Sequence, residues 1–408
     1  MSLSRLPPRK RALLVVFGCM MCQMGAGWFY ASKALSPDVI SDMGWTRTMW
    51  SSGMAPMIFV SSLAQAFVGA ACVRFGVRPV VVCSIISLAL SVVALATMQG
   101  PTQFYAAMIL MALGNAGIGD VSIGGVVTRW FEKHRSLALG VAMVGTNIGA
   151  VVFIGAMTGV SGDTSWRTSA LLVGLGGLAV ILPFALFVVR DPRPGEGAAL
   201  EAEDEAGEAA PVRASLDLRT AIRRPAFWIL FYTLFCYSLV QLGLLDHLVL
   251  YLIDLGYSED EAKAALGLTV GAGILSKLGA GVITLRVPPK TALLVNTGVL
   301  VTSMILVPFA SDARLLNLCG FLFGLSTSAR DVFLPMALAD AFGARYFAQI
   351  YGVVMLAFIP GAVLGPIVLA WTHDLIGHYR PGFAGGVVLL VLAFLALTRL
   401  SRPQLEGV

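Results

Sequence analysis

Long apolar runs separated by short polar segments dominate the pattern along this chain. A helix needs about 20 mostly apolar residues to cross the hydrocarbon core of a bilayer. Twelve runs meet this requirement, and they cover residues 12–35, 50–73, 79–98, 102–127, 137–160, 168–189, 226–253, 262–285, 291–310, 314–341, 346–371 and 382–398. The pattern therefore predicts an all-α membrane protein with twelve transmembrane helices.

The longest polar segment divides these runs into six and six. We expect an N-terminal six-helix half over residues 1–189, a cytoplasmic acidic linker over 190–225 and a C-terminal six-helix half over 226–408. The linker is rich in Ala, Glu, Gly and Pro, so it lacks the apolar surface that a folded core needs. It ends in a short basic stretch, Arg219 to Arg224, which we expect to lie along the membrane surface.

The two halves share an internal repeat. Asp42, Gly44 and Trp45 follow the first run, and the similar Asp254, Gly256 and Tyr257 follow the seventh run with the same spacing. Such a duplication is typical of transporters with two pseudo-symmetric halves, whose substrate site lies between the halves near the bilayer midplane.

The distribution of basic residues predicts the topology. Of the 28 Lys and Arg residues, 20 lie in segments on the side of the N-terminus, five on the opposite side and three within spans. Basic residues concentrate in cytoplasmic loops, so both termini are expected in the cytoplasm, with the protein in a bacterial inner (cell) membrane. The net charge of +5 then reflects loops that face anionic lipid and indicates no nucleic-acid partner.

Several ionisable residues fall inside the apolar runs, where each costs roughly 2.5–3.5 kcal/mol on insertion scales. Lys277, Arg330 and Asp331 are expected near mid-membrane. Lys33, Asp246 and His247 are expected near the outer ends of their spans, and Asp120 near the inner end of the fourth. The functional interpretation is that Lys277 and Arg330 attract an anion, while Asp331, Asp246 or His247 carries a proton.

Each of these residues also has a structural interpretation. Lys33 could extend to the outer headgroups, and one of Arg330 and Asp331 could belong to an interhelical pair. Asp120 could be a gate or a helix cap, and the amide of Asn115 could bind substrate or a neighbouring helix. His373 and His378 are expected to be solvated in the last outer loop.

Three segments resemble a known family. Residues 69–78, GAACVRFGVR, resemble the G-x-x-x-D-R-x-G-x-R loop of major facilitator transporters, with Val73 in place of the aspartate. Residues 130–145, WFEKHRSLALGVAMVG, resemble the span-five segment of the monocarboxylate transporter family. Residues 25–33, GAGWFYASK, resemble the first helix of that family, in which a lysine near the outer end takes part in binding.

The resemblance implies a major facilitator fold and a transporter of the monocarboxylate or oxalate-formate type. It implies substrate contacts from Lys33 and Tyr30, and cytoplasmic gates that include Arg74, Arg78 and Arg135. The chain departs from the family in span eight, where Gly273 and Lys277 replace an Asp and an Arg. The missing Asp removes the familiar proton site, and Lys lacks the planar fork of Arg.

We therefore expect a monomeric symporter that moves a small monocarboxylate such as lactate or pyruvate with a proton, by alternating access and without a cofactor. The alternative is an anion exchanger of the oxalate-formate type, although residues 346–371 lack the span-eleven lysine of that group. A receptor is disfavoured because the chain has no sizeable soluble domain. An enzyme is disfavoured because no nucleophile-base arrangement or phosphate loop occurs, and the four scattered histidines lack metal-site spacing.

Overall fold

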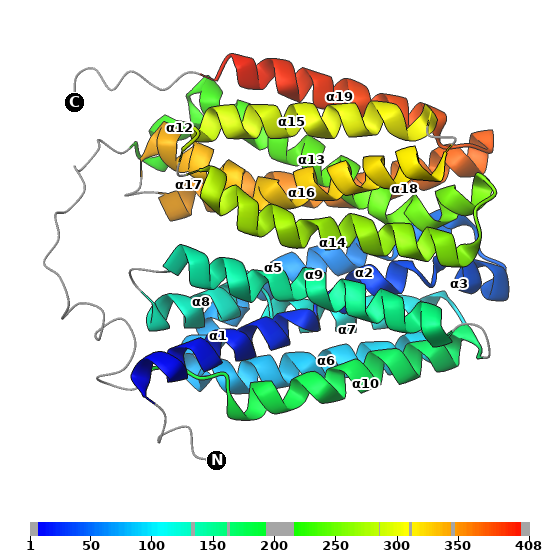
Figure 1. Ribbon diagram of the computed structural model, residues 1–408, viewed down its shortest axis with the longest axis horizontal. Helices are drawn as coiled ribbons and strands as arrows, with labels where there is room; N and C mark the ends of the chain where they lie inside the picture. Colours follow the sequence, from blue (N-terminus) through cyan, green and yellow to red (C-terminus); the bar gives the residue numbers. More distant parts are fainter. Residues whose placement is uncertain are drawn as a thin grey trace, which may run out of the picture. The chain divides into compact units, whose positions relative to one another are not determined.

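The computed structural model describes residues 7–131, 135–160, 164–192, 216–284, 286–309, 312–343 and 347–400, and every element in these ranges is a helix (Figure 1). The acidic part of the predicted linker, residues 193–215, lies outside them.

In the described ranges, ten α-helices precede the linker. They are α1 (Pro8–Met24), α2 (Gly27–Lys33), α3 (Ser36–Met43), α4 (Arg47–Ser52), α5 (Met54–Phe75), α6 (Val77–Ala96), α7 (Pro101–Gly117), α8 (Asp120–Trp130), α9 (Arg135–Val160) and α10 (Trp166–Phe187). Within the basic end of the linker lies α12 (Leu218–Ile222). The described elements that follow are α13 (Pro225–Asp254), α14 (Glu259–Ile283), α15 (Pro289–Leu306), η2 (Val307–Phe309), α16 (Ala313–Phe342), α17 (Phe347–Val354), η3 (Met355–Ala357), α18 (Phe358–Ile376) and α19 (Arg380–Thr398).

The chain divides into two compact units. Unit 1 contains Met1–Trp45 and Gly53–Glu208, and unit 2 contains Thr46–Ser52 and Ala209–Val408. The short segment Thr46–Ser52, which includes α4, thus packs with the C-terminal unit although unit 1 precedes and follows it in sequence.

The helices account for the predicted spans. Among the described residues, ten helices are long and apolar enough to cross a membrane, and the bent pair Arg47–Gln65 and Phe67–Phe75 brings the number to eleven. The 30-residue α16 corresponds to the remaining span, the tenth in the predicted order, and is less apolar because it carries Arg314, Arg330 and Asp331. The all-α membrane class is therefore confirmed.

Four predicted spans are interrupted rather than continuous. The first breaks between α1 and α2 at Gly25, the second between α4 and α5 at Gly53, and the fourth between α7 and α8 at Gly119. The eleventh contains the 3₁₀ turn η3 and ends at Ile376, beyond the predicted residue 371. Glycine lowers helix propensity by about 1 kcal/mol relative to alanine, so three of these breaks fall where the helix is weakest.

The internal repeat has a structural counterpart in two turns. Gly44 and Gly256, which occupy matching places in the repeat, both adopt positive φ angles, of 63° and 90°. The hydroxyl that follows each glycine accepts a hydrogen bond from the helix that begins there, Thr46 from Met49 N at 3.1 Å and Ser258 from Glu261 N at 3.3 Å. The two halves therefore share the same glycine turn and N-cap.

A second counterpart is a close helix crossing in each unit. In unit 1, a Cβ on Gly149 of α9 would lie 2.1 Å from Met24 O of α1. In unit 2, a Cβ on Gly361 of α18, the position that matches Gly149 in the repeat, would lie 2.5 Å from Phe235 O of α13. Only glycine permits these approaches, as in other tightly packed membrane helices.

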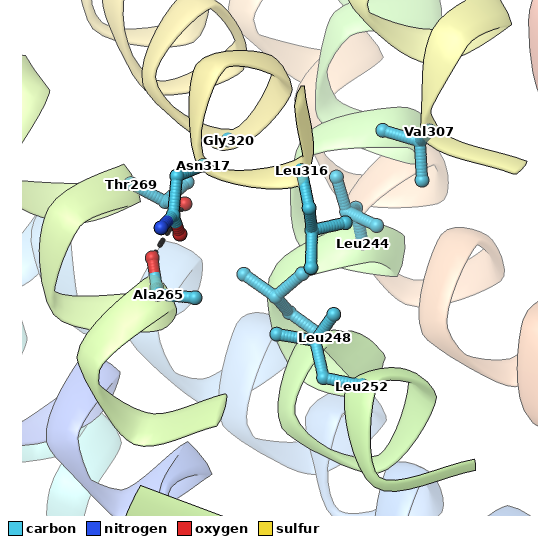
Figure 2. A pocket seen from close by; sticks show the side chains of 9 residues that line it. All are labelled: Leu244, Leu248, Leu252, Ala265, Thr269, Val307, Leu316, Asn317 and Gly320. Atoms are coloured by element: carbon cyan, nitrogen blue, oxygen red, sulfur yellow. Dashed lines mark hydrogen bonds between the residues drawn. The ribbon is translucent and has the colours of Figure 1, made fainter. Parts of the chain in front are cut away.

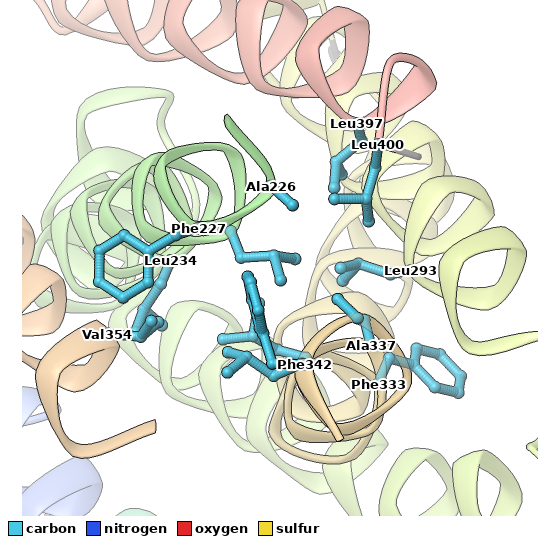
Figure 3. Close-up of a cluster of buried hydrophobic side chains, with 14 of the residues drawn as sticks. Ala226, Phe227, Leu234, Leu293, Phe333, Ala337, Phe342, Val354, Leu397 and Leu400 are labelled. Carbon is cyan, nitrogen blue, oxygen red and sulfur yellow. The ribbon is translucent and has the colours of Figure 1, made fainter. Parts of the chain in front are cut away.

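The core of unit 2 near the start of α13 is a cluster of buried apolar side chains (Figure 3). Figure 3 shows Phe227 and Leu234 of α13 beside Val354 of α17, with Phe342 of α16 at the centre of the cluster and Leu397 of α19 next to Leu400 at its other side. The short α12, which begins the basic stretch, packs there through the fully buried Ala221.

The N-cap of α12 is Asp217. Hydrogen bonds from Thr220 to its carboxyl hold the pKa of that carboxyl below its usual value.

Candidate functional site

Arg330 is a buried cation in the middle of α16. It is the eighteenth of 30 helical residues and is 7% exposed. One nitrogen, Nη2, pairs with the carboxylate of Asp331, and the guanidinium carbon lies 5.7 Å from the centre of the Phe358 ring. The other nitrogen, Nη1, is buried and has no hydrogen-bond partner among the described residues. A desolvated guanidinium with a donor left over is suited to a carboxylate.

Asp331 faces a different direction from Arg330. Its side chain is 46% exposed, whereas that of Arg330 is 9% exposed. This agrees with the separation of about 100° between neighbouring helix residues. The sequence alternatives for the pair included an interhelical contact. The structure instead joins the two side chains to each other on one helix.

A polar network lies next to Arg330 and fixes three helices. Asn296 of α15 donates from Nδ2 to the Tyr237 hydroxyl of α13 at 3.0 Å and to Ser326 O of α16 at 2.9 Å. Tyr237 also contacts the Thr297 hydroxyl at 3.1 Å and is fully buried. Tyr237 lies close enough to interact electrostatically with Arg330. The network therefore sets the positions of the helices that flank the cation.

Lys277 occupies α14, and its side chain is half-buried. The neighbouring Ser276 donates to Leu325 O of α16, which ties α14 to the helix of Arg330. Close contact between Gly324 of α16 and Thr269 O of α14, where a Cβ would approach to 1.8 Å, holds the same two helices together. Unit 2 thus contains both predicted mid-membrane cations, on adjacent helices.

Unit 1 contains the predicted residues of the first and fourth spans. Lys33 is 5% exposed, with its ammonium 3.0 Å from the Met54 sulfur and 5.0 Å from the centre of the Phe29 ring. Such burial disfavours extension to the headgroups. Tyr30 is half-buried and packs edge-on against Phe29 at 5.0 Å. Asn115 of α7 is half-buried, and its Oδ1 has no hydrogen-bond partner within the described part of the chain.

Asp246 and His247 are buried together near the end of α13. Ser51 of α4 donates to Asp246 Oδ2 at 2.6 Å and lies 3.0 Å from His247 Nε2. His247 Nε2 is also 3.0 Å from Pro366 O, while His247 Nδ1 is 3.1 Å from the Tyr379 hydroxyl.

These contacts suit one neutral tautomer of His247. Burial raises the pKa of Tyr379, so its hydroxyl keeps its proton. That hydroxyl accepts from Arg47 at 2.6 Å and can donate to His247 Nδ1. Nε2 then carries the hydrogen and donates to the Pro366 carbonyl. The neutral imidazole thus has a partner at each nitrogen.

A further polar cluster near the Tyr379 hydroxyl was not predicted. Arg47 of α4 makes a two-pronged ion pair with Asp254, both contacts being 2.6 Å. His373 Nε2 lies 3.2 Å from the same carboxylate. The expectation that His373 is solvated in a loop is wrong, because α18 extends to Ile376 and leaves its side chain 19% exposed. His378 is exposed, as expected.

The predicted gating residues lie at the ends of helices in unit 1. Arg74 is exposed at the end of α5, with its guanidinium 5.2 Å from the centre of the Phe75 ring. Arg78 donates to Val189 O at 3.1 Å. The side chains of Asp120 and Arg135 lie outside the described residues, although their backbones begin α8 and α9.

An ion pair that was not predicted lies close to residues 69–78, the segment that resembles the family loop. Arg129 pairs with Asp191 at 2.7 Å, and Val73, which replaces the aspartate of the family loop, is 87% exposed.

A small pocket in unit 2 does not suit an anion. It lies among α13, α14, α16 and η2 (Figure 2). The lining is Leu244, Leu248, Leu252, Ala265, Thr269, Val307, Leu316, Asn317 and Gly320. The free volume is ≈ 10 Å³, about the space of one water molecule. In the ranges that the structure describes, no group of three or more His, Cys, Asp or Glu side chains could hold a metal ion.

The fold and these sites match a known family. The sequence pattern of the Major Facilitator Superfamily matches residues 16–329. The chain therefore belongs to the Major Facilitator Superfamily and is a multi-pass membrane transporter.

Curated relatives and solved structures agree with this assignment. Monocarboxylate transporter 13 of Rattus norvegicus is 24% identical over 386 residues, with 88% of this chain and 83% of the relative covered. The hexuronate transporter of Bacillus subtilis is 26% identical over 386 residues, with 89% and 86% covered. A bacterial homologue of the human lysosomal transporter Spinster shares the fold, with a TM-score of 0.72, 16% identity and 97% of both chains covered.

Proposed function

We propose that this protein is a proton-coupled symporter of small monocarboxylates, of the lactate or pyruvate kind, which works by alternating access. The observation that carries the proposal is the buried guanidinium of Arg330, whose Nη1 has no partner among the described residues. A buried cation is costly in a membrane. A substrate carboxylate would relieve that cost. The names of two kinds of relative, monocarboxylate and hexuronate transporters, are consistent with an anionic substrate.

Charge balance supplies a route for coupling. Arg330 is paired with Asp331 before substrate arrives. A substrate carboxylate that binds Arg330 adds a second negative charge beside one guanidinium. Protonation of Asp331 restores neutrality, and the proton then accompanies the substrate. Asp246 and His247 form the other candidate proton site, and Lys277 and Lys33 contribute positive charge for substrate.

We also propose a bacterial inner membrane location with both termini in the cytoplasm, and function as a monomer. The surplus of Lys and Arg in the segments on the side of the N-terminus supports this orientation.

The test is uptake of labelled lactate or pyruvate into proteoliposomes, with and without an inward proton gradient. Accumulation driven by the gradient supports symport. Uptake only into vesicles preloaded with a second carboxylate supports the alternative, an exchanger of the oxalate-formate type, for which two cations in unit 2 could hold a dianion. The absence of uptake under both conditions would refute the substrate assignment.

Replacement of Asp331 tests the route for coupling. Asp331→Asn removes the ionisable group while keeping the size of the side chain. We expect carboxylate exchange across the membrane to continue and accumulation driven by the proton gradient to be lost. Accumulation that persists in Asp331→Asn would transfer the coupling role to Asp246 or His247, which the matched Asp246→Asn variant then examines.

A further inference from the structure

Gln241 is a polar residue in the apolar α13 that the proposed mechanism does not use. Its Oε1 atom is buried and finds no hydrogen-bond donor in the described ranges. Its neighbours on both sides, Val240 and Leu242, are buried and apolar. An unsatisfied buried acceptor lowers stability, so its presence requires an explanation.

Helix geometry relates the height of Gln241 on α13 to the height of Arg330 on α16. Gln241 follows Tyr237 by one turn and therefore lies on the same side of α13. Asn296 joins the Tyr237 hydroxyl to Ser326 O, and Arg330 follows Ser326 by one turn of α16. Tyr237 and Ser326 therefore lie at the same height along the helix axes, and this height falls between those of Gln241 and Arg330.

The helices α13 and α16 run in opposite directions. Leu252 near the end of α13 and Leu316 near the start of α16 line the same pocket (Figure 2). Gln241 and Arg330 are therefore on opposite sides of the Tyr237 level, with backbones about 12 Å apart along the axis. Side chains lean toward the N-terminus of their own helix, so these two lean toward each other.

The two orphaned groups are complementary. Arg330 Nη1 is a donor that lacks an acceptor, and Gln241 Oε1 is an acceptor that lacks a donor, among the residues that the structure describes. A carboxylate satisfies the first. A hydroxyl satisfies the second, and it does so for either orientation of the amide because it both donates and accepts.

We propose that the substrate is a hydroxy acid, in which Arg330 binds the carboxylate and Gln241 binds a hydroxyl several bonds away. The inference rests on the proposed transport of carboxylates and extends it from lactate and pyruvate to acids whose hydroxyl is remote from the carboxylate, as in sugar acids. The level of Tyr237 lies between the two ends along the helix axis. Gln241 is then a residue that determines specificity, while Arg330 supplies the affinity common to all carboxylates.

The experiment compares acids that differ by one hydroxyl. Calorimetry on the purified full-length protein measures the affinity for 6-hydroxyhexanoate and hexanoate, and for 4-hydroxybutyrate and butyrate. We expect the hydroxylated member of at least one pair to bind about five- to tenfold more tightly, as one neutral hydrogen bond allows. Gln241→Leu should abolish that ratio and leave the affinity for the plain acid unchanged.

The controls separate recognition from a structural role. Thr302→Val removes a hydroxyl of α15 that bonds to Gly298 O of its own helix, and it should leave the ratio unchanged. Gln241→Leu removes an unsatisfied acceptor, so its melting temperature without ligand should equal or exceed that of the parent protein.

Equal affinities within both pairs for the parent protein, or a ratio that survives in Gln241→Leu, would overturn the inference and leave carboxylate transport standing. Failure of the parent protein to bind any of the four acids would also overturn the inference, whereas the proposed function is decided separately by the uptake of lactate or pyruvate into proteoliposomes.

Discussion

Arg330 and Lys277 are cations within the long helices α16 and α14 of unit 2. A guanidinium held at 7% exposure inside a membrane helix is too costly to serve packing alone. Its orphaned Nη1 gives the side chain a chemical need that Asp331 on the same helix does not meet. Lys277 is less constrained, because its side chain is half-buried and an ammonium acts as a point charge.

Substitution of these cations should reduce substrate binding. Arg330→Gln should weaken carboxylate binding about 10- to 100-fold, since hydrogen bonds to charged groups contribute about 1.5–3 kcal/mol. Lys277→Ala should abolish saturable binding while the protein stays folded. Equilibrium binding of labelled carboxylate measures both effects. Arg380→Gln, which removes an exposed guanidinium, is the matched control and should bind normally. Normal affinity in either variant removes that residue from the site.

The sequence singles out residues whose signal is local and does not single out those whose partners are distant. Arg330 and Asp331 stand out because two charges interrupt a long apolar run. Ser51 gave no such signal, because its role depends on Asp246, 195 residues away. Gln241 was missed because a single amide in a 30-residue apolar helix is unremarkable until its Oε1 atom is seen to lack a donor among the described residues.

The close crossing of α13 and α18 is the clearest constraint at the level of elements. A Cβ on Gly365 of α18 would lie 2.0 Å from Leu239 O of α13. The obstacle is backbone, which cannot rotate away as a side chain can. The long apolar runs predicted both helices but not the close contact between them. A glycine in a long apolar run is equally consistent with close packing and with flexibility.

Enlargement of Gly365 should therefore destabilise unit 2. Gly365→Ala forces α13 and α18 apart, and overpacking of this kind costs about 1–3 kcal/mol. Thermal unfolding in detergent should show a lower melting temperature. The control is Gly385→Ala in α19, where a Cβ would meet no atom within 4 Å and helix propensity improves by up to about 1 kcal/mol. Equal melting temperatures for the two variants would contradict the close crossing.

At the level of the whole chain, the structure describes two compact units. The internal repeat, first visible as two similar turns, recurs in the glycine crossings of both units. The division into units nevertheless departs from a simple cut at the linker, because Thr46–Ser52 groups with unit 2. No local pattern distinguishes that segment, whose contacts lie with residues far along the chain, such as Asp246 and Asp254.

The proposed orientation can be tested on the whole protein in intact cells. Single cysteines are introduced at two exposed loop positions in a variant without native cysteines, His378→Cys and Arg286→Cys. If both termini are cytoplasmic, a membrane-impermeant maleimide should label His378→Cys from outside and Arg286→Cys only after lysis. Labelling in the reverse order would show that the termini are external.

The contacts of α4 also have a consequence for biosynthesis. Ser51 is synthesised 195 residues before Asp246, and Thr48 is synthesised 326 residues before Asp374. At translation rates of about 5–20 residues per second, the partner of each residue is synthesised roughly 10 s to a minute later. An N-terminal half released at the linker would never acquire them. The two halves, expressed as separate chains, should therefore accumulate only when they are produced together.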